Sequence, residues 1–232
     1  MQSRGVEPHV LSSCAASSAC EKGKQWERAL ALLEEMQSRG VEPDVISFSA
    51  AISACEQGKQ WERALSLLEE MRTRGVEPSV RSFSAAISAC EKGGQWERAL
   101  ALLEEMHSRG VEPDVIIFSA AISACEKGGQ WERALELLEE MHSRGLEPNK
   151  FSFSAAISAC EKGGQWERAL ALLEDMAERG LAPDVISFSA AISACEKGGQ
   201  WQLALVLLDQ LQERGLEPNV ISFNAAISAC EK

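Results

Sequence analysis

The chain has 232 residues, a net charge of −12 and a hydrophobic content of 45%. No stretch of it approaches the roughly 20 apolar residues that a membrane-spanning helix needs. The negative charge argues against strong non-specific binding to nucleic acid, because the phosphate backbone attracts basic surfaces. No signal peptide is visible, and we expect neither a membrane nor a small-molecule substrate as a partner.

A unit of 35 residues recurs from one end of the sequence to the other. Six tryptophans, starting at Trp26, and seven prolines, starting at Pro8, each reappear at this interval without insertion or deletion. Full copies span 10–44, 45–79, 80–114, 115–149, 150–184 and 185–219, with partial copies at 1–9 and 220–232. Such a period is typical of a solenoid, in which each unit packs on its neighbours. We therefore expect one elongated array over residues 1–232 and, because both end copies are cut, a piece of a longer array.

Each copy predicts two helices, as the one beginning at Val115 illustrates. Residues 117–127 carry an apolar stripe of Phe118, Ile122 and Cys125 at helical spacing, and a Gly-Gly pair at 128–129 ends it. A second stripe consists of Trp131, Ala134, Leu135, Leu138 and Met141, so we expect the repeated tryptophan to lie in the core. Glu140 and Arg144 are spaced to pair along this helix. Nothing alternates with the period of a strand, so the predicted fold is all-α, with stacked antiparallel helix pairs.

Seven of the eight cysteines occupy one position on the first apolar stripe, and Cys14 stands apart. Stacked helices lie about 8–10 Å apart, whereas a disulfide needs Cα atoms about 4.4–6.8 Å apart. There is no Cys-x-x-Cys sequence, and the histidines lie elsewhere in the repeat. We therefore expect buried, reduced thiols and no metal site, which indicates a reducing compartment.

The copies resemble the pentatricopeptide repeat of the P type, which also has 35 residues. The resemblance is carried by VISFSAAISAC at 45–55, WERAL at 131–135 and EEMHSRGVEPD at 104–114. The tetratricopeptide repeat has 34 residues and a glycine and a large aromatic in its first helix, where this chain has Ile52 and Ser53. The resemblance implies a right-handed α-solenoid superhelix that binds single-stranded RNA at one base per repeat. It also implies a role in organellar RNA processing, stabilisation, splicing or translation, in the chloroplast or mitochondrion, with no cofactor.

The resemblance further implies that the fifth and the last residue of each copy read the base. These pairs are Cys14 with Asp44, Ser49 with Ser79, Ser84 with Asp114, Ser119 with Asn149, Ser154 with Asp184 and Ser189 with Asn219, and Asn224 has no partner within the sequence. Serine with aspartate resembles the guanine-preferring pair, and serine with asparagine the adenine-preferring pair. The four copies over 80–219 would then prefer G-A-G-A, and the first two full copies leave the base open.

Two more positions carry over from the resemblance. The second residue of each copy would sandwich the base, and this position holds Ile46, Arg81, Ile116, Phe151, Ile186 and Ile221. The lysine that ends the first helix would contact phosphate, at Lys22, Lys92, Lys127, Lys162 and Lys197, and Gln57 interrupts this row.

Other interpretations stay open for the same residues. Aspartate, asparagine and serine before a helix are also common N-caps, and the lysines also complement the negative end of a helix dipole. A protein-binding scaffold is the alternative function, because α-solenoids often bind proteins and the chain is acidic overall. Most of that acidity falls on the second helix and so describes the outer side more than the inner one. Nothing in the sequence indicates a catalytic site, so we do not expect an enzyme.

Overall fold

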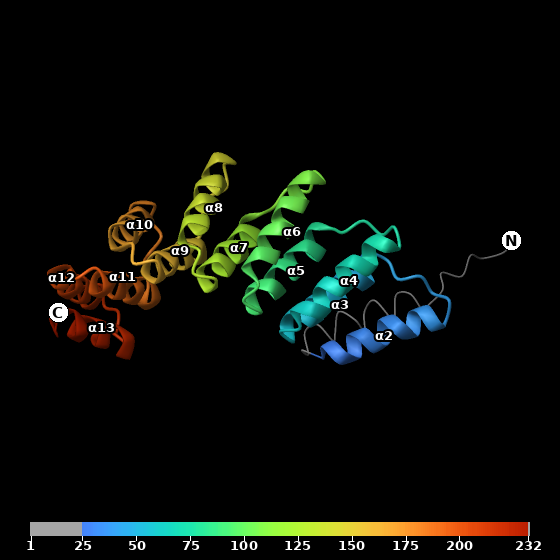
Figure 1. Cartoon of the computed structure of the whole chain (residues 1–232), viewed down its shortest axis with the longest axis horizontal. Helices are drawn as coiled ribbons and strands as arrows, with labels where there is room; N and C mark the ends of the chain where they lie inside the picture. Colours follow the sequence, from blue (N-terminus) through green and yellow to red (C-terminus); the bar gives the residue numbers. More distant parts are fainter. Residues whose placement is uncertain (1–24, 232) are drawn as a thin grey trace. The chain divides into compact units, whose positions relative to one another are not determined.

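In the computed structural model, residues 25–231 are described, and within that range the chain forms twelve helices and no strand (Figure 1). This confirms the all-α prediction. The chain divides into two compact units, Met1–Pro113 and Asp114–Lys232, and we describe each by itself. The first contains α2 (Trp26–Ser38), α3 (Val45–Gln57), α4 (Trp61–Thr73), α5 (Val80–Lys92) and α6 (Trp96–Ser108). The second contains α7 (Val115–Lys127), α8 (Trp131–Ser143), α9 (Lys150–Lys162), α10 (Trp166–Glu178), α11 (Val185–Lys197), α12 (Trp201–Glu213) and α13 (Val220–Glu231).

The first helix of each copy begins two residues earlier than its apolar stripe predicts. The reason is an N-cap: the Asp114 Oδ1 atom accepts a hydrogen bond from the Ile117 backbone N–H at 2.9 Å, which satisfies a donor in the first turn. The same helix ends at Gly128, and Gly129 follows with φ +69°. Glycine takes this left-handed conformation without the steric cost that a Cβ adds. The two glycines therefore end the helix as expected.

The first helices form the tightly packed layer of each unit. In the first unit α3 packs on α5, and in the second α7, α9, α11 and α13 pack in sequence. Within each unit a second helix packs closely on its own first helix, as α4 does on α3, and on the first helix of the next copy, as α4 does on α5, whereas successive second helices such as α4 and α6 meet through side chains. Five phenylalanines at one repeat position fill this layer and are at most 1% exposed: Phe48, Phe83, Phe118, Phe153 and Phe188. The core is thus shared between neighbouring copies, which confirms the solenoid architecture.

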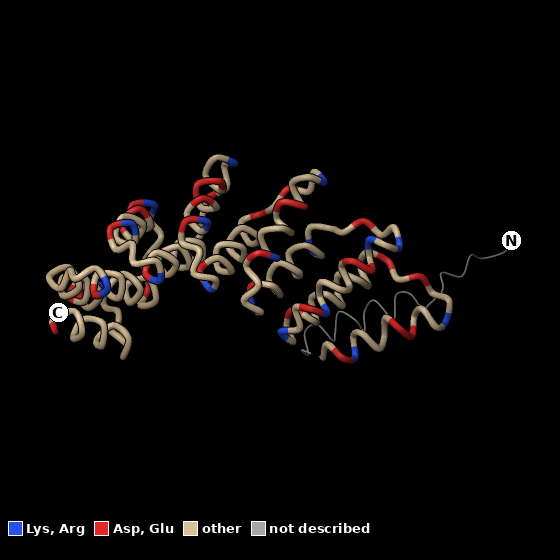
Figure 2. Tube along the Cα trace, viewed as in Figure 1, with Lys and Arg blue, Asp and Glu red and all other residues tan. Residues whose placement is uncertain are grey.

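The second helices carry most of the acidic side chains, as Figure 2 shows for α6 and α8. Their inner face buries alanine, leucine and methionine, such as Ala134, Leu138 and Met141 in α8. The predicted pair is present, since Arg144 Nη2 lies 2.7 Å from Glu140 Oε1. None of the described helices is both long and apolar enough to cross a membrane.

The tryptophans are less buried than the apolar stripe predicts. Trp61 and Trp131 are half-buried, and Trp201 is 45% exposed. Four of the indoles lie at a boundary between copies, as Trp61 shows, because a Cβ atom placed on Gly93 of the next copy would be only 2.3 Å from Trp61 Cδ1. The Arg98 guanidinium lies over the Trp61 ring at 5.2 Å from its centroid. The tryptophan therefore joins neighbouring copies and is only partly a core residue.

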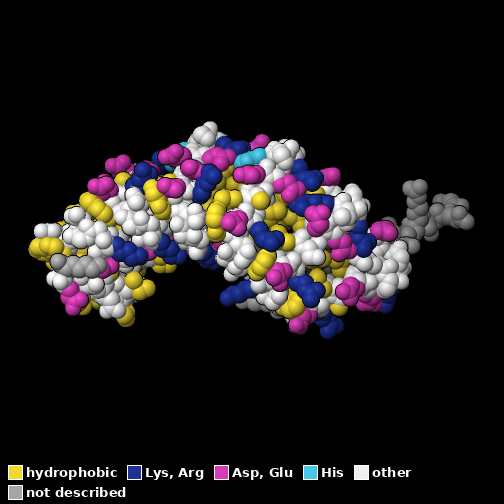
Figure 3. All heavy atoms as spheres, viewed as in Figure 1, with side chains coloured by type: hydrophobic (Ala, Val, Ile, Leu, Met, Phe, Trp, Pro, Cys, Tyr) yellow, Lys and Arg dark blue, Asp and Glu magenta, His cyan; other side chains and the backbone are white. Residues whose placement is uncertain are grey.

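The last described helix, α13, leaves apolar side chains uncovered. Phe223 is 43% exposed and Ile227 63% exposed, and Cys230 is also exposed. Hydrophobic side chains are visible at this end of the chain in Figure 3.

Candidate nucleic-acid interface

The fifth-position serines join successive first helices through their hydroxyl groups. The Ser119 Oγ atom donates to the Val115 carbonyl oxygen at 2.6 Å, and it lies 2.8 Å from Ser152 Oγ on the next first helix. Either hydroxyl of this pair can be the donor, because each has one proton and a second nearby acceptor, the Val115 carbonyl for Ser119 and Asn149 Oδ1 for Ser152. The same link joins Ser49 to Ser82 at 2.8 Å and Ser189 to Ser222 at 2.7 Å. These serines are therefore already hydrogen-bonded within the protein.

The third-position serines in these links were not singled out by sequence reasoning. Ser82, Ser152, Ser187 and Ser222 are fully buried. Their signal in the sequence is a serine in almost every copy at the third helical residue, where Ile117 is the exception. A polar residue that recurs on an otherwise apolar stripe indicates a hydrogen-bonded partner in the neighbouring copy.

The structure brings three of the predicted reading pairs close together. The Oγ atoms of Ser49 and Ser79 are 3.4 Å apart. The Oγ atom of Ser119 is 3.5 Å from Asn149 Oδ1, and that of Ser189 is 3.4 Å from Asn219 Oδ1.

The remaining predicted reading residues are placed less directly. Ser154 and Asp184 are linked through Ser187, whose Oγ lies 2.9 Å from Ser154 Oγ and donates to Asp184 Oδ1 at 3.0 Å. Ser84 lies in the first unit and Asp114 in the second. Asn224 is exposed on α13. Cys14 lies outside the described residues, so the Cys14–Asp44 pair stays a prediction.

An aspartate or asparagine at the last position of a copy caps the following helix through its Oδ1 atom, and its second polar side-chain atom, Oδ2 or Nδ2, lies beside the cap. Asn149 Oδ1 accepts from the Ser152 backbone N–H at 3.0 Å. Since only the amide oxygen can accept this bond, the Asn149 Nδ2 group is oriented as a donor. Asp114 caps α7 through Oδ1 and so has Oδ2 as an acceptor. The two residue types thus present opposite hydrogen-bonding groups from one backbone position.

Ser79 differs from both, because its single oxygen is committed. The Ser79 Oγ atom accepts from the Ser82 backbone N–H at 3.3 Å, and Ser82 Oγ accepts from the Ser79 backbone N–H at 3.2 Å, which completes a capping box. No second side-chain atom remains at this position.

The second-position residues are exposed, and in the second unit four successive copies present an apolar side chain there. Ile46, Ile116, Phe151, Ile186 and Ile221 are between 60% and 77% exposed, with Phe151 the most exposed. Arg81 is also exposed. Each of these side chains follows the capping residue by two positions. Every described first helix therefore begins with one polar capping side chain and one exposed side chain at the second position. Repeated exposure of large apolar side chains at one position is typical of a binding surface.

The predicted phosphate-contacting lysines form ion pairs with the preceding copy. Lys162 Nζ lies 2.5 Å from Glu126 Oε1 and donates to the Glu126 carbonyl oxygen at 3.2 Å. Lys197 makes the same two contacts with Glu161, at 2.5 Å and 3.3 Å, and Lys92 pairs with Glu56. These contacts support the interpretation that the lysines complement helix C-termini. Lys127 ends α7, and Lys22 lies outside the described residues.

The repeated cysteines lie in the core between the helices. Cys55, Cys90, Cys125, Cys160 and Cys195 are fully buried, and burial raises the pKa of each thiol to about 11. A raised pKa keeps the thiol protonated and unreactive. Over residues 25–231, no group of three or more His, Cys, Asp or Glu side chains is arranged to hold a metal ion.

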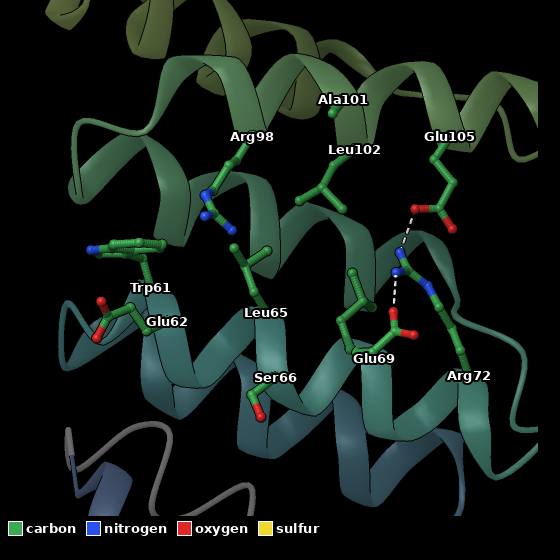
Figure 4. A pocket seen from close by; sticks show the side chains of 11 residues that line it. Trp61, Glu62, Leu65, Ser66, Glu69, Arg72, Arg98, Ala101, Leu102 and Glu105 are labelled. Carbon is green, nitrogen blue, oxygen red and sulfur yellow. Dashed lines mark hydrogen bonds and ion pairs between the residues drawn. The ribbon is translucent and has the colours of Figure 1, made fainter.

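A groove of about 650 Å³ separates the second helices α4 and α6 (Figure 4). Leu65 and Leu102 face each other across it, and Arg72 bridges Glu69 and Glu105 at one end. This groove contains none of the predicted base-reading or base-sandwiching residues. It lies among the second helices, which carry most of the acidic side chains, and is separate from the exposed second-position side chains of the first helices.

Comparisons with known proteins agree with this architecture. The family model described as the pentacotripeptide-repeat region of PRORP matches residues 8–140, a pentatricopeptide repeat domain model matches 171–232, and a PPR repeat model matches 151–181. No curated protein matches the chain.

Several solved structures also resemble the chain. PPR10 from maize is 29% identical over 96% of this chain and 32% of that chain, with a TM-score of 0.64. PPR10 in complex with an 18-nt psaJ RNA element is 29% identical over 94% of this chain and 32% of that chain, with a TM-score of 0.77. The present chain thus spans about a third of PPR10.

The PPR domain of Arabidopsis thaliana PRORP1, in complex with tRNA, is 16% identical over 78% of this chain and 95% of that domain, with a TM-score of 0.68. At this identity the likeness concerns the fold alone. The first family model covers more than half of the sequence. The chain therefore belongs to the pentatricopeptide repeat family.

Proposed function

We propose that the chain binds single-stranded RNA sequence-selectively, with one base per repeat along the layer of first helices. The observation that carries the proposal is the alternation of exposed apolar side chains, such as Ile116 and Phe151, with capping residues such as Asn149. An unstacked base has apolar faces and a polar edge. A base inserted between two second-position side chains would contact apolar groups on its faces and the capping residue at its edge.

The capping residue supplies the selectivity in this proposal. Asp114 offers an acceptor, which suits the N1–H and N2–H donors of guanine. Asn149 offers a donor through Nδ2, which suits a ring-nitrogen acceptor of adenine. The four copies over 80–219 would then read G-A-G-A. The fifth-position serines mainly hold successive first helices together, since a hydroxyl such as that of Ser119 is hydrogen-bonded to its own helix and to the next first helix.

The relatives support the same assignment. PPR10, which is 29% identical to this chain, has been solved in complex with an 18-nt psaJ RNA element. We propose a binding role without catalysis or a cofactor. Its setting would be organellar RNA processing, stabilisation, splicing or translation, in the chloroplast or mitochondrion.

The charge of the chain predicts that base contacts, more than phosphate contacts, determine the affinity. The net charge is −12, and Lys162 and Lys197 are neutralised by glutamates of the preceding copies. Few counterions would be released from the RNA on binding, so the affinity should depend only weakly on salt. Selectivity should therefore exceed what a basic protein of the same size shows.

A direct binding comparison tests the proposal. Fluorescence anisotropy with an eight-base RNA that contains GAGA should give tighter binding than with the same RNA carrying CUCU. The double variant Phe151→Ser and Ile186→Ser should weaken binding to GAGA, whereas Glu139→Gln on the outer helix α8 serves as the control. Equal affinity for the two RNAs would overturn the proposal.

A protein-binding scaffold is the second candidate, and the groove between α4 and α6 favours it. Leu65→Glu would place a charge in this groove without touching the first-helix row. A scaffold role predicts that this change abolishes partner binding in a pull-down, whereas RNA binding should be unaffected by it.

A further inference from the structure

The copy over 150–184 differs from its neighbours at its first residue. This position holds Lys150, whereas Val45, Val80, Val115, Val185 and Val220 occupy it in the other described copies. The Lys150 Nζ atom lies 2.9 Å from Asp184 Oδ2, and the two side chains are 43% and 28% exposed. The lysine therefore pairs with the capping residue to which the proposed function assigns guanine.

Both oxygens of Asp184 are engaged as a result. Oδ1 accepts from the Ser187 backbone N–H at 2.9 Å and from Ser187 Oγ at 3.0 Å, while Oδ2 accepts from Lys150. In Asp44 and Asp114 the cap is formed by Oδ1. Burial raises the pKa of Asp184, but the hydrogen bonds from Ser187 and Lys150 outweigh it and lower the pKa below its usual value. The carboxylate is thus charged at neutral pH, and the ion pair persists there.

An aspartate alone presents only hydrogen-bond acceptors to a base, whereas an aspartate paired with a lysine presents both acceptors and donors. The carboxylate alone only accepts, which favours guanine with its two adjacent donors. Lysine adds ammonium donors, and adenine, cytosine and uracil each carry an acceptor next to a donor on the Watson–Crick edge. The pair Lys150–Asp184 can satisfy one acceptor and one donor on any of these edges.

The neighbouring side chain retains affinity whatever the base. Phe151, directly after Lys150, is 77% exposed, and stacking of a base on an aromatic ring is tolerant of base identity. Lys150 should therefore change the selectivity of this copy much more than its affinity.

We infer that Lys150 relaxes base selectivity at the copy 150–184, so that this is the least selective guanine position in the G-A-G-A site. The inference rests on the proposed function. It assigns to Lys150 the role of a specificity-determining residue, which acts by sharing the Asp184 oxygen with the bound base.

The test substitutes Lys150→Met, which keeps the length of the side chain and removes the ammonium group. Affinities are measured for four RNAs that differ only at the third base of GAGA. The preference for guanine over the other three bases should rise about two- to fivefold, the range that the strength of an exposed ion pair allows. Lys162→Met removes the same charge from the far end of α9 and should leave this ratio unchanged. A ratio that stays the same or falls in Lys150→Met would overturn the inference.

A parallel measurement separates this inference from the proposed function. The first base of GAGA, assigned to Asp114, is varied in the wild-type protein. Absence of any preference there would overturn the proposed function itself. A clear preference at the first base, with an equally strong preference at the third base of the wild type, would overturn only the role of Lys150. Without RNA, NMR titration should show a higher Asp184 pKa in Lys150→Met, and an unchanged value would contradict the ion pair.

Discussion

The contact between tryptophan and glycine predicts a large effect from a small change, Gly93→Ala. Gly93 follows α5 with φ −87°, a conformation that alanine adopts without backbone strain. The added Cβ would lie 2.3 Å from Trp61 Cδ1, 2.6 Å from Cγ and 3.1 Å from the tryptophan Cβ. Carbon atoms in contact are normally about 3.5–4.0 Å apart. Rotating the ring about the Cβ–Cγ bond cannot move Cγ, so either the tryptophan leaves its χ1 rotamer or the two copies separate.

The magnitude follows from two opposing effects. Overpacking of this kind typically costs about 1–3 kcal/mol, and replacing glycine by alanine at a compatible φ returns about 0.4–1 kcal/mol through the unfolded state. We expect Gly93→Ala to lower the free energy of unfolding by about 1–2 kcal/mol. In a Trp61→Ala background the indole and its Cγ are absent, and the same change should be neutral or stabilising.

A double-mutant cycle followed by circular dichroism in urea measures this coupling. Gly163→Ala with Trp131→Ala repeats the cycle in the second unit, where the added Cβ would lie 2.2 Å from Trp131 Cδ1. An equal loss of stability from Gly93→Ala with and without Trp61 would refute the explanation, because the effect would then not arise from the indole.

Two further predictions concern the backbone and the thiols. Lys59 has φ +57°, a left-handed conformation that Gly94 and Gly129 adopt at the equivalent positions of other copies. Replacing it by glycine removes this backbone strain, so Lys59→Gly should raise the free energy of unfolding in urea by about 0.5–1 kcal/mol. A lower free energy of unfolding in this variant would contradict the strain at Lys59. The buried thiols have a pKa of about 11 when folded, against about 8.5 when unfolded. Above this unfolded value the unfolded state binds fewer protons, so stability should fall as pH rises toward 11, by at most about 1.4 kcal/mol per thiol and pH unit. Cys125→Ala should make this fall shallower, and an unchanged slope would contradict the thiol assignment.

The helices and their ends could be predicted because each depends on residues close in sequence. Gly128 and Gly129 end a helix through their own backbone preferences, and Asp114 caps the next one from the adjacent position. The two-residue error at the start of α7 arose because the apolar stripe was used as the boundary, although the cap lies before Val115. The handedness of the array over the whole chain stays a prediction.

The contacts between copies could not be read from one copy. The link between Ser119 and Ser152 spans 33 residues, and the pair Lys162–Glu126 spans 36. Their partners depend on how far successive helices are displaced along each other, which the apolar pattern does not determine. The partial exposure of Trp61 has the same origin, since the next copy offers Gly93 rather than a side chain to cover the indole. The roles in RNA reading came from the family resemblance and remain proposals.

The most direct test of sequence-selective RNA binding is Asn149→Asp, measured with RNAs that carry adenine or guanine at the second base of GAGA. Aspartate keeps an oxygen for the cap that Asn149 Oδ1 makes with the Ser152 backbone N–H, so the fold should be unaffected. The group beside the cap changes from a donor to an acceptor. We predict that the preference reverses from adenine to guanine, with a change in the affinity ratio of about five- to a hundredfold, as expected for exchanging one base-edge contact. An unchanged ratio in a folded variant would contradict the account.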